Sequence, residues 1–311
     1  MPTTHKLDAQ QVHHEWNNAL APRLTIDPGD TVVFDTRDAS DHYYSRTSTH
    51  PDVLARGPFR GHPLTGPVSV RGAAPGDTLV IEIVDVRPAL DFGWTAIRPG
   101  RGLLPESDFA SPFLNIWDLD AGFARMGKRV AVPIEAFPGV MGVALEEPGG
   151  HSTMPPRRAG GNMDIKQLVA GATLWLPVLV DGALFSAGDA HAAQGDGEVC
   201  VTAVEMMGRL TLRFNVQSGR RLAEPQLRTP APPSNATNRG AHYATTAHGP
   251  DLFAASQQAV RYMIDHIVEA HGLSREQAYV VCSVAVDLKI SEIVDAPNWI
   301  VSAFLPESIF V

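Results

Sequence analysis

Short apolar and β-branched runs that follow turn residues predict a chain rich in short β-strands. Residues 31–34 follow Pro28-Gly29-Asp30, and residues 78–84 follow Pro75-Gly76-Asp77. In both places a Pro-Gly-Asp turn precedes a β-branched run, which is typical of a turn that leads into a strand.

An Asp-Gly pair separates two more apolar runs. Residues 173–180 precede Asp181-Gly182, and residues 183–187 follow it. Because Asp-Gly readily adopts the positive φ angles of a tight turn, we expect these runs to form a β-hairpin. Apolar runs at residues 199–206 and 210–216 continue the β pattern.

The pattern changes after residue 251. Apolar residues recur at helical spacing from Leu252 until His271-Gly272, which predicts one helix. The sequence Ser274-Arg275-Glu276-Gln277 then predicts a capping box that opens a second helix. Residues 290–294 are a further candidate strand, which Asp295-Ala296-Pro297 would end.

These patterns predict a mainly β fold, a β-rich sandwich or barrel-like body, with a C-terminal α/β segment. We expect the body to span residues 1–222 and to carry the candidate chemistry. Residues 223–240 are expected to form an exposed connection, because residues 224–240 contain four prolines and few apolar side chains. Residues 241–311 would form a helical segment that packs on the body.

Composition narrows the class of protein. The 27 glycines and 25 prolines among 311 residues fit many turns, and the net charge of −9 argues against nucleic acid as a partner.

The longest nearly apolar stretch is too short to cross a bilayer, so we expect no membrane association. The start has no apolar signal-peptide core, and Cys200 and Cys282 lie among apolar neighbours. We therefore expect reduced thiols and a cytoplasmic location.

The strongest local chemical signal follows the expected hairpin. Asp189 and His191 are two residues apart, so they point to the same face if the strand continues. A carboxylate and an imidazole presented in this way can bind one divalent metal ion. The alternative is a polar loop in which Asp189 caps backbone amides and His191 is solvated.

Two further polar segments are candidate parts of a site. Asn162 and Asp164 follow paired glycines, which allow a close approach to a ligand, although a glycine turn before an Asx-capped helix is an equal alternative. Asp38 lies in an acidic loop after the strand at residues 31–34 and is either a ligand or solvated. We interpret His62 and the prolines after it as turn-like and structural.

Taken together, the segments resemble the acetamidase/formamidase family over most of the chain and in the expected order. The most specific motif is Gly188-Asp189-Ala190-His191-Ala192-Ala193-Gln194-Gly195-Asp196-Gly197-Glu198-Val199, with Glu205 at the family's spacing. The other motifs are Pro28-Gly29-Asp30-Thr31, Pro63-Leu64-Thr65-Gly66-Pro67, Pro75-Gly76-Asp77-Thr78, Pro138-Gly139-Val140-Met141-Gly142-Val143, Gly160-Gly161-Asn162-Met163-Asp164, and Leu176-Pro177-Val178 with Gly182-Ala183-Leu184-Phe185.

The resemblance implies a homodimer or homotetramer that hydrolyses short amides, of the formamide or acetamide type, to carboxylate and ammonia. It also implies a divalent metal, zinc first, with Mn²⁺ or Ca²⁺ as alternatives that oxygen-rich ligands would suit. The positions that match the family's motifs are Asp38, Asn162, Asp164, Asp189, His191, Asp196, Glu198 and Glu205.

We expect Asp189, His191 and Asp38 to bind the metal, which would activate water and polarise the amide carbonyl. Either Glu198 or Glu205 would move the proton from water to the departing nitrogen. Three more positions complete the expected site: Asn162 as an oxyanion donor, Asp164 as a further catalytic residue and Asp196 as a substrate-binding residue.

The segments at residues 41–50 and 91–127 depart from the family's pattern and leave the substrate open. A lactam or another small C–N substrate is therefore an alternative to a linear amide. A non-catalytic small-molecule binding protein on the same fold is a second alternative, although the intact Asp189, His191 and Glu198 count against it.

Overall fold

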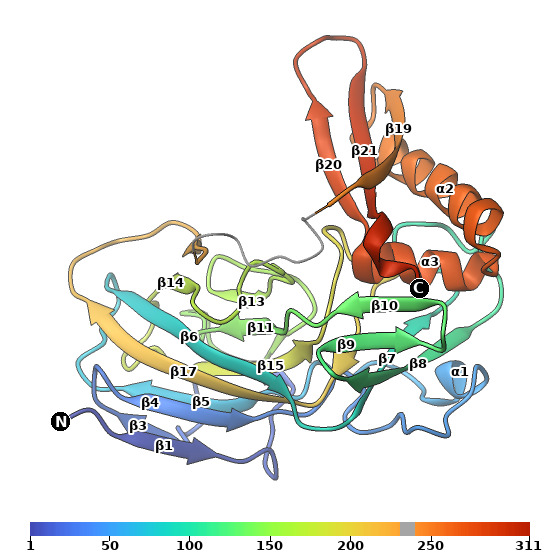
Figure 1. The fold of residues 1–311 in the computed structure, drawn as a ribbon. Coiled ribbons are helices and arrows are strands. Elements are labelled where there is room, and N and C mark those ends of the chain that lie inside the picture. The colour runs from blue at the N-terminus through green and yellow to red at the C-terminus, as the bar shows by residue number, and fades with distance from the viewer. Residues whose placement is uncertain (231–239) are drawn as a thin grey trace.

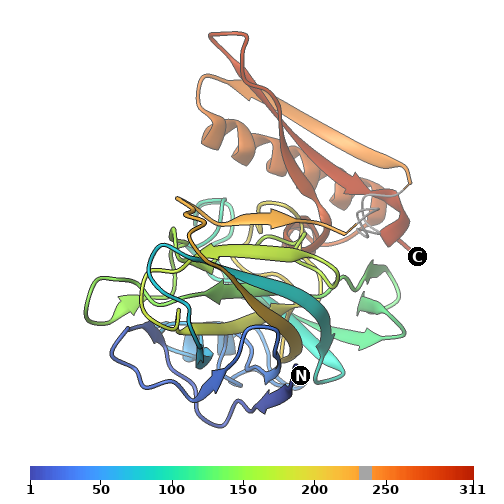
Figure 2. The same cartoon turned by 90° about the vertical axis from the view of Figure 1, so that its left-hand side faces the viewer.

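The computed structural model describes residues 1–230 and 240–311. It is mostly β-strand, with 39% strand and 13% helix, as the turn-and-strand pattern predicts. We call residues 1–228 the β body and residues 242–311 the C-terminal unit. Figure 1 shows the C-terminal unit standing on the β body, and Figure 2 shows it as a separate layer above the strands.

The β body contains two main sheets. The strands of the first, in spatial order, are β1 (Thr4–Leu7), β4 (Thr31–Asp35), β17 (Gly208–Gln217), β6 (Thr78–Pro88), β14 (Thr173–Pro177) and β18 (Gln226–Arg228). The second has the order β10 (Val130–Pro133), β9 (Phe123–Met126), β8 (Phe113–Asp120), β7 (Phe92–Ile97), β16 (Glu205–Met206), β15 (Phe185–His191), β11 (Phe137–Gly142) and β13 (Gly160–Asn162), with β5 (Thr65–Val70) on β15 and β3 (Leu24–Ile26) on β5. A small ribbon joins β2 (Glu15–Trp16) to β12 (His151–Ser152), and α1 (Asp52–Ala55) is a short helix.

The core of the β body lies between these sheets. Phe34 on β4 and Phe214 on β17 come from the first sheet, and Phe185 on β15 comes from the second. Their rings are fully buried, with centroids 5.1–6.2 Å apart. Burial of such large side chains between two apolar faces is the main force that holds a sandwich together.

The hairpin predicted around Asp181-Gly182 is wrong. β14 pairs with β6 and β18, whereas β15 pairs with β11, β5 and β16 in the other sheet. Asp181-Gly182 does form a turn, in which the Ala183 amide donates to Val180 O (3.0 Å), but the flanking residues bond to an earlier turn: the Val178 amide donates to Asp77 O (2.9 Å) and the Gly182 amide to Ala73 O (2.8 Å). The chain therefore crosses from one sheet to the other, which buries the apolar faces of both strands.

One more strand prediction and the prediction of the connection need adjustment. In the apolar run at residues 199–206 only β16 is a strand, because the Val199 carbonyl accepts a hydrogen bond from the Tyr279 hydroxyl and the Cys200 amide donates to Ser283 Oγ (3.1 Å). In the expected connection, β18 forms an edge strand on β14. The rest of that connection, residues 231–239, lies outside the described residues.

The two helices of the C-terminal unit form as their local signals predict, whereas β19 (His242–Gly249) and β21 (Trp299–Pro306) were not predicted. A sheet of β19, β21 and β20 (Asp287–Glu292) accompanies α2 (Leu252–His271), α3 (Arg275–Ala285) and η2 (Glu307–Ile309). Asp251 caps α2, and Gly272 ends it in a left-handed conformation. Ser274 and Gln277 form the predicted capping box of α3. No helix in the described part of the chain is long and apolar enough to span a membrane.

Candidate metal centre and active site

Asp189 and His191 lie side by side at the end of β15. Asp189 is 3% exposed and His191 is 1% exposed, and Asp189 Oδ1 lies 3.5 Å from His191 Nε2. Asp189 has a φ angle of +53°, so the backbone departs from regular strand geometry at this residue. Both groups nevertheless lie in one buried site, so the solvated-loop alternative is wrong.

Glu205 reaches the same point from the neighbouring strand. In the β15–β16 ladder His191 is directly opposite Glu205, and Glu205 Oε2 lies 3.4 Å from His191 Nε2. The other carboxylate oxygen, Oε1, accepts a hydrogen bond from the Ala203 amide at 3.1 Å. One oxygen therefore fixes the side chain, and the other faces the imidazole.

Asp164 and Glu198 complete the cluster from two loops. A carboxylate oxygen of Asp164 lies within 4.8 Å of ligand atoms of Asp189 and His191, and one of Glu198 lies within 4.8 Å of those of His191 and Glu205. Asp164 has a φ angle of +49°, and residues 165–168 form no helix, so the Asx-capped helix considered for this segment is wrong. We use "carboxylate cluster" for Asp164, Asp189, His191, Glu198 and Glu205.

Gln194 fixes the orientation of the His191 ring. Its Nε2 donates to the Asp164 carbonyl (2.8 Å), so its Oε1 is the atom that faces His191 Nδ1 at 2.9 Å. His191 Nδ1–H therefore donates to Gln194, and Nε2 is the ring nitrogen that points into the cluster. Such a contact to the far ring nitrogen is the usual support of a metal-binding histidine.

The electrostatics of the carboxylate cluster follow from burial and crowding. Burial raises the pKa of Glu205 to about 8 and that of Asp164 to about 7, although His191 opposes both shifts. Burial also raises the pKa of Glu198 well above its usual range. For His191, burial lowers the pKa, but Glu205 and Asp189 outweigh it and raise the pKa well above the usual value.

Asp189 behaves differently from the other carboxyl groups. Burial would raise its pKa, but the neighbouring His191 and His62 outweigh that effect and hold the pKa below the usual range. The cluster therefore crowds several carboxyl groups around few positive charges, and a bound divalent cation would stabilise their ionised forms.

The residues present fit a metal ion. Asp189 Oδ1, His191 Nε2, Glu205 Oε2 and Asp164 Oδ1 are all buried without a hydrogen-bond partner in the described part of the protein. Such orphaned atoms are costly unless a ligand satisfies them. The 3.4 and 3.5 Å separations at His191 Nε2 are near the roughly 3.3 Å between neighbouring ligand atoms of a tetrahedral site with bonds of about 2.0–2.1 Å.

His62 is a site residue that the sequence interpretation missed. Its side chain is buried, and Nε2 lies 3.6 Å from Asp189 Oδ2. Burial lowers its pKa. The local signal was a histidine before Pro63 in a turn-like segment, which gave no indication that β5, immediately after it, pairs with β15.

Gly139 on β11 leaves the space that the cluster needs. A Cβ atom there would lie 2.6 Å from Asp164 Oδ1 and 2.8 Å from His191 Cε1. Both distances are below any ordinary carbon contact, so only glycine fits between these side chains without displacing them.

Three predicted site residues lie outside the carboxylate cluster. Asp38 is buried and its Oδ1 accepts the Ser40 amide at 2.6 Å. Asn162 donates its side-chain amide to the Met154 carbonyl at 3.1 Å. Asp196 contacts Gln167 (3.2 Å) and Lys166 (3.9 Å).

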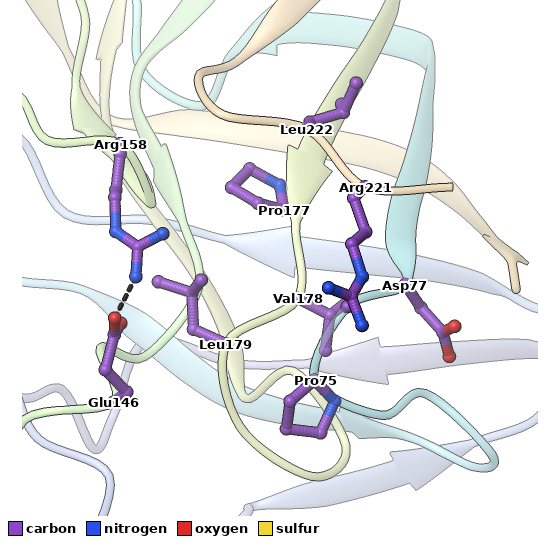
Figure 3. Close-up of a pocket in the computed structure, with 10 residues that line it drawn as sticks. Pro75, Asp77, Glu146, Arg158, Pro177, Val178, Leu179, Arg221 and Leu222 are labelled. Atoms are coloured by element: carbon purple, nitrogen blue, oxygen red, sulfur yellow. Dashed lines mark hydrogen bonds and ion pairs between the residues drawn. The ribbon is translucent and has the colours of Figure 1, made fainter. Parts of the chain in front are cut away.

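A separate surface cavity of about 350 Å³ lies beside the end of β14 and the turn that precedes β6. Figure 3 shows Arg158 paired with Glu146 on one side of it and Arg221 on the other. Pro177 and Val178 line it between those charges. Its lining shares no residue with the carboxylate cluster, so this cavity is not the space next to the candidate metal site.

Comparisons with known proteins identify the family of this chain. A family model described as the Acetamidase/Formamidase family matches residues 2–149 and 145–311. A formamidase from Methylophilus methylotrophus is 29% identical, with 96% of this chain and 89% of the relative covered. The structure of a gamma lactamase from Delftia acidovorans superposes with a TM-score of 0.91 at 26% identity, covering 99% of this chain and 93% of that one.

An acetamidase structure from Bacillus halodurans has a higher identity and a lower TM-score. It is 32% identical, covers 96% of both chains and superposes with a TM-score of 0.68. The family match extends over the whole length from residue 2 to residue 311, and it includes every strand that carries the carboxylate cluster. This protein therefore belongs to the acetamidase/formamidase family.

Proposed function

We propose that the protein is a metal-dependent amidohydrolase that cleaves a short-chain amide, of the formamide or acetamide type, to a carboxylate and ammonia. The observation that carries this proposal is the set of buried, unpartnered atoms at Asp189 Oδ1, His191 Nε2 and Glu205 Oε2. Asp189 Oδ1 and Glu205 Oε2 each lie 3.4–3.5 Å from His191 Nε2, and these distances, with the His191–Gln194 contact, support the three residues as the ligands of the ion, zinc first. Family membership supports the reaction class.

When bound, the ion would polarise the amide carbonyl and make water a better nucleophile at neutral pH. The chain's own contribution is to hold the three ligand atoms in place and to move a proton. Amide nitrogen leaves only after protonation, so a carboxyl group must lie beside the scissile bond. We assign that role to Glu198, because it is half-buried, lies within 4.8 Å of the ligand atoms, and is not needed to complete the triad.

A five-membered lactam is the second candidate substrate. The gamma lactamase structure superposes over nearly all of this chain with a much higher TM-score than the acetamidase structure does. The chemistry at the carbon–nitrogen bond would be the same. The products distinguish the two substrates, because a lactam opens to an amino acid and releases no ammonia.

The test combines metal analysis with product analysis. The purified protein is analysed for metals by mass spectrometry, and formamide, acetamide and a simple γ-lactam are assayed before and after chelation. We expect near-stoichiometric metal and chelator-sensitive ammonia release. Chelator-sensitive ring opening without ammonia release would replace the linear amide with the lactam. Metal-free protein with undiminished hydrolysis would overturn the ligand assignment.

The homodimer or homotetramer that the family resemblance implies remains part of the proposal. Sedimentation equilibrium of the protein at assay concentrations tests it. A monomer that retains full activity would contradict it.

A further inference from the structure

His62 lies against the oxygen of Asp189 that faces away from His191. Asp189 Oδ1 is the oxygen 3.5 Å from His191 Nε2, and Oδ2 is the oxygen 3.6 Å from His62 Nε2. The carboxylate is therefore held between two imidazoles. Both histidines are buried, with 1% exposure for His191 and 6% for His62, so water has little access to compete for these contacts.

Thr153 is the partner of the ring nitrogen of His62 that faces away from Asp189. Thr153 Oγ1 accepts the His62 backbone N–H at 2.7 Å and also lies 3.1 Å from His62 Nδ1. A threonine hydroxyl can accept from Nδ1 or donate to it. When it donates, the ring proton is on Nε2, the atom that faces Asp189.

The other face of His62 is fixed by packing. The ring of Phe59 meets it edge to face, with centroids 4.8 Å apart. Thr153 at Nδ1 and Phe59 against the ring restrict rotation of the imidazole. The 3.6 Å between His62 Nε2 and Asp189 Oδ2 is an ion-pair distance, longer than a hydrogen bond.

We propose that His62 is a positioning residue: its Nε2–H holds Oδ2 of Asp189, so that Oδ1 stays directed at His191 and Glu205. Asp189 needs such a restraint because its positive φ angle removes it from the regular strand that would otherwise fix its direction. The role resembles that of the outer hydrogen-bond partners that orient metal ligands. This inference rests on the metal site of the proposed function.

Two substitutions at His62 test whether its role depends on a hydrogen-bond donor at the Nε2 position or only on the volume of the side chain. Glutamine places an amide N–H near the position of Nε2, whereas asparagine is shorter and places it near Nδ1. We expect His62→Asn to weaken zinc binding by about 10–100-fold and His62→Gln to restore most of the affinity. Zinc dissociation constants are measured by competition with a chromophoric chelator, with native folding checked by circular dichroism.

Substitutions at Thr153 test the His62–Asp189 contact through the residue that hydrogen-bonds to the other ring nitrogen of His62. Thr153→Val removes that hydrogen bond and should weaken zinc binding in the same direction, whereas Thr153→Ser should retain it. His248→Asn makes the same change at an exposed histidine and should bind zinc like the wild type. These variants also keep the proposal testable if His62→Asn does not fold.

The outcomes separate this inference from the proposed function. Wild-type protein that binds no zinc contradicts the proposed function itself. Wild-type protein that binds zinc, with His62→Asn binding equally tightly, overturns only the role of His62. Equal weakening in His62→Asn and His62→Gln also overturns it, because the imidazole would then act as a ligand or by its volume and not as a donor.

Discussion

Lys166 and Asp287 form an ion pair that is buried between the β body and the C-terminal unit. The side chains are 3% and 7% exposed, and Asp287 also accepts the Asp196 amide at 3.0 Å. Lys166 is two residues from Asp164, and Asp196 is two residues from Glu198. The pair therefore ties both loops of the carboxylate cluster to the start of β20.

Removal of one partner of this pair should be strongly destabilising. Asp287→Asn leaves the buried Lys166 with Asp196, 3.9 Å away, as its acidic partner, and we expect the free energy of unfolding to fall by about 3 kcal/mol. Glu82→Gln, which removes the exposed pair with Arg213, should cost about 0–1 kcal/mol. Urea unfolding of both variants measures the difference, and equal small effects would show that the buried pair contributes little.

Metal retention should depend on His191 and not on Asp38. His191→Ala removes the imidazole shared by both groups of candidate ligands, so the variant should lose bound metal on dialysis and lose activity. Asp38→Asn should keep the metal, because the Asp38 carboxylate bonds to Ser40 and lies outside those groups. Metal analysis by mass spectrometry tests both. A metal-free Asp38→Asn protein would restore Asp38 as a ligand.

Glu198→Gln should separate metal binding from turnover. The amide keeps the size of the side chain but cannot transfer the proton, so kcat should fall by about 10²–10⁴-fold while the metal content stays near that of the wild type. Steady-state kinetics and metal analysis on the same preparation are the measurement. Unchanged kcat would assign proton transfer to another carboxyl group of the cluster.

Gly139→Ala should disrupt the site locally. Its new Cβ would lie 2.6 Å from Asp164 Oδ1 and 2.8 Å from His191 Cε1, so one of them must move. We expect weaker metal binding and at least about tenfold lower activity, of the order seen when groups that orient metal ligands are lost. Gly249→Ala is the control, because nothing lies within 4 Å of a Cβ at that position. A fully active Gly139→Ala enzyme would show that the cluster has room to adjust.

Because Cys200 and Cys282 are buried, we expect the free energy of unfolding to fall at high pH. Burial raises the pKa of Cys200 to about 11, and burial also raises the pKa of Cys282. An unfolded thiol ionises near pH 8.5, so above that pH the native state retains protons that the unfolded state loses. The stability contributed by the neutral thiols is complete below about pH 8.5 and falls as pH rises toward 11, by up to about 1.4 kcal/mol per pH unit for each thiol.

Urea unfolding between pH 8 and pH 9.5 measures this slope. The double variant Cys200→Ala with Cys282→Ala should show a shallower decline, whatever its absolute stability. Identical slopes for the variant and the wild type would mean that the thiols ionise as readily in the folded protein as in the unfolded chain.

Features determined by a few consecutive residues could be predicted from the sequence. The cap of α3 at Ser274 and the end of α2 at Gly272 depend on hydrogen bonds and φ angles within one turn of helix. The strand at residues 31–34 likewise follows from its own turn and β-branched residues. The hairpin predicted at Asp181-Gly182 did not form, although the turn sequence permits one. The burial of the apolar faces of both strands decides which sheet each strand joins, and this placed them in different sheets.

The sequence by itself determined that Asp189 and His191 lie two residues apart at the end of one strand, since that spacing is local. Only the tertiary structure decided which groups meet them. Glu205 lies opposite His191 through the β15–β16 register, and His62 reaches Asp189 because β5 pairs with β15. Asp38 follows a strand of the other sheet and contacts its own loop instead. Strand partners are chosen by the collective burial of side chains between sheets, and no short stretch of sequence contains that information.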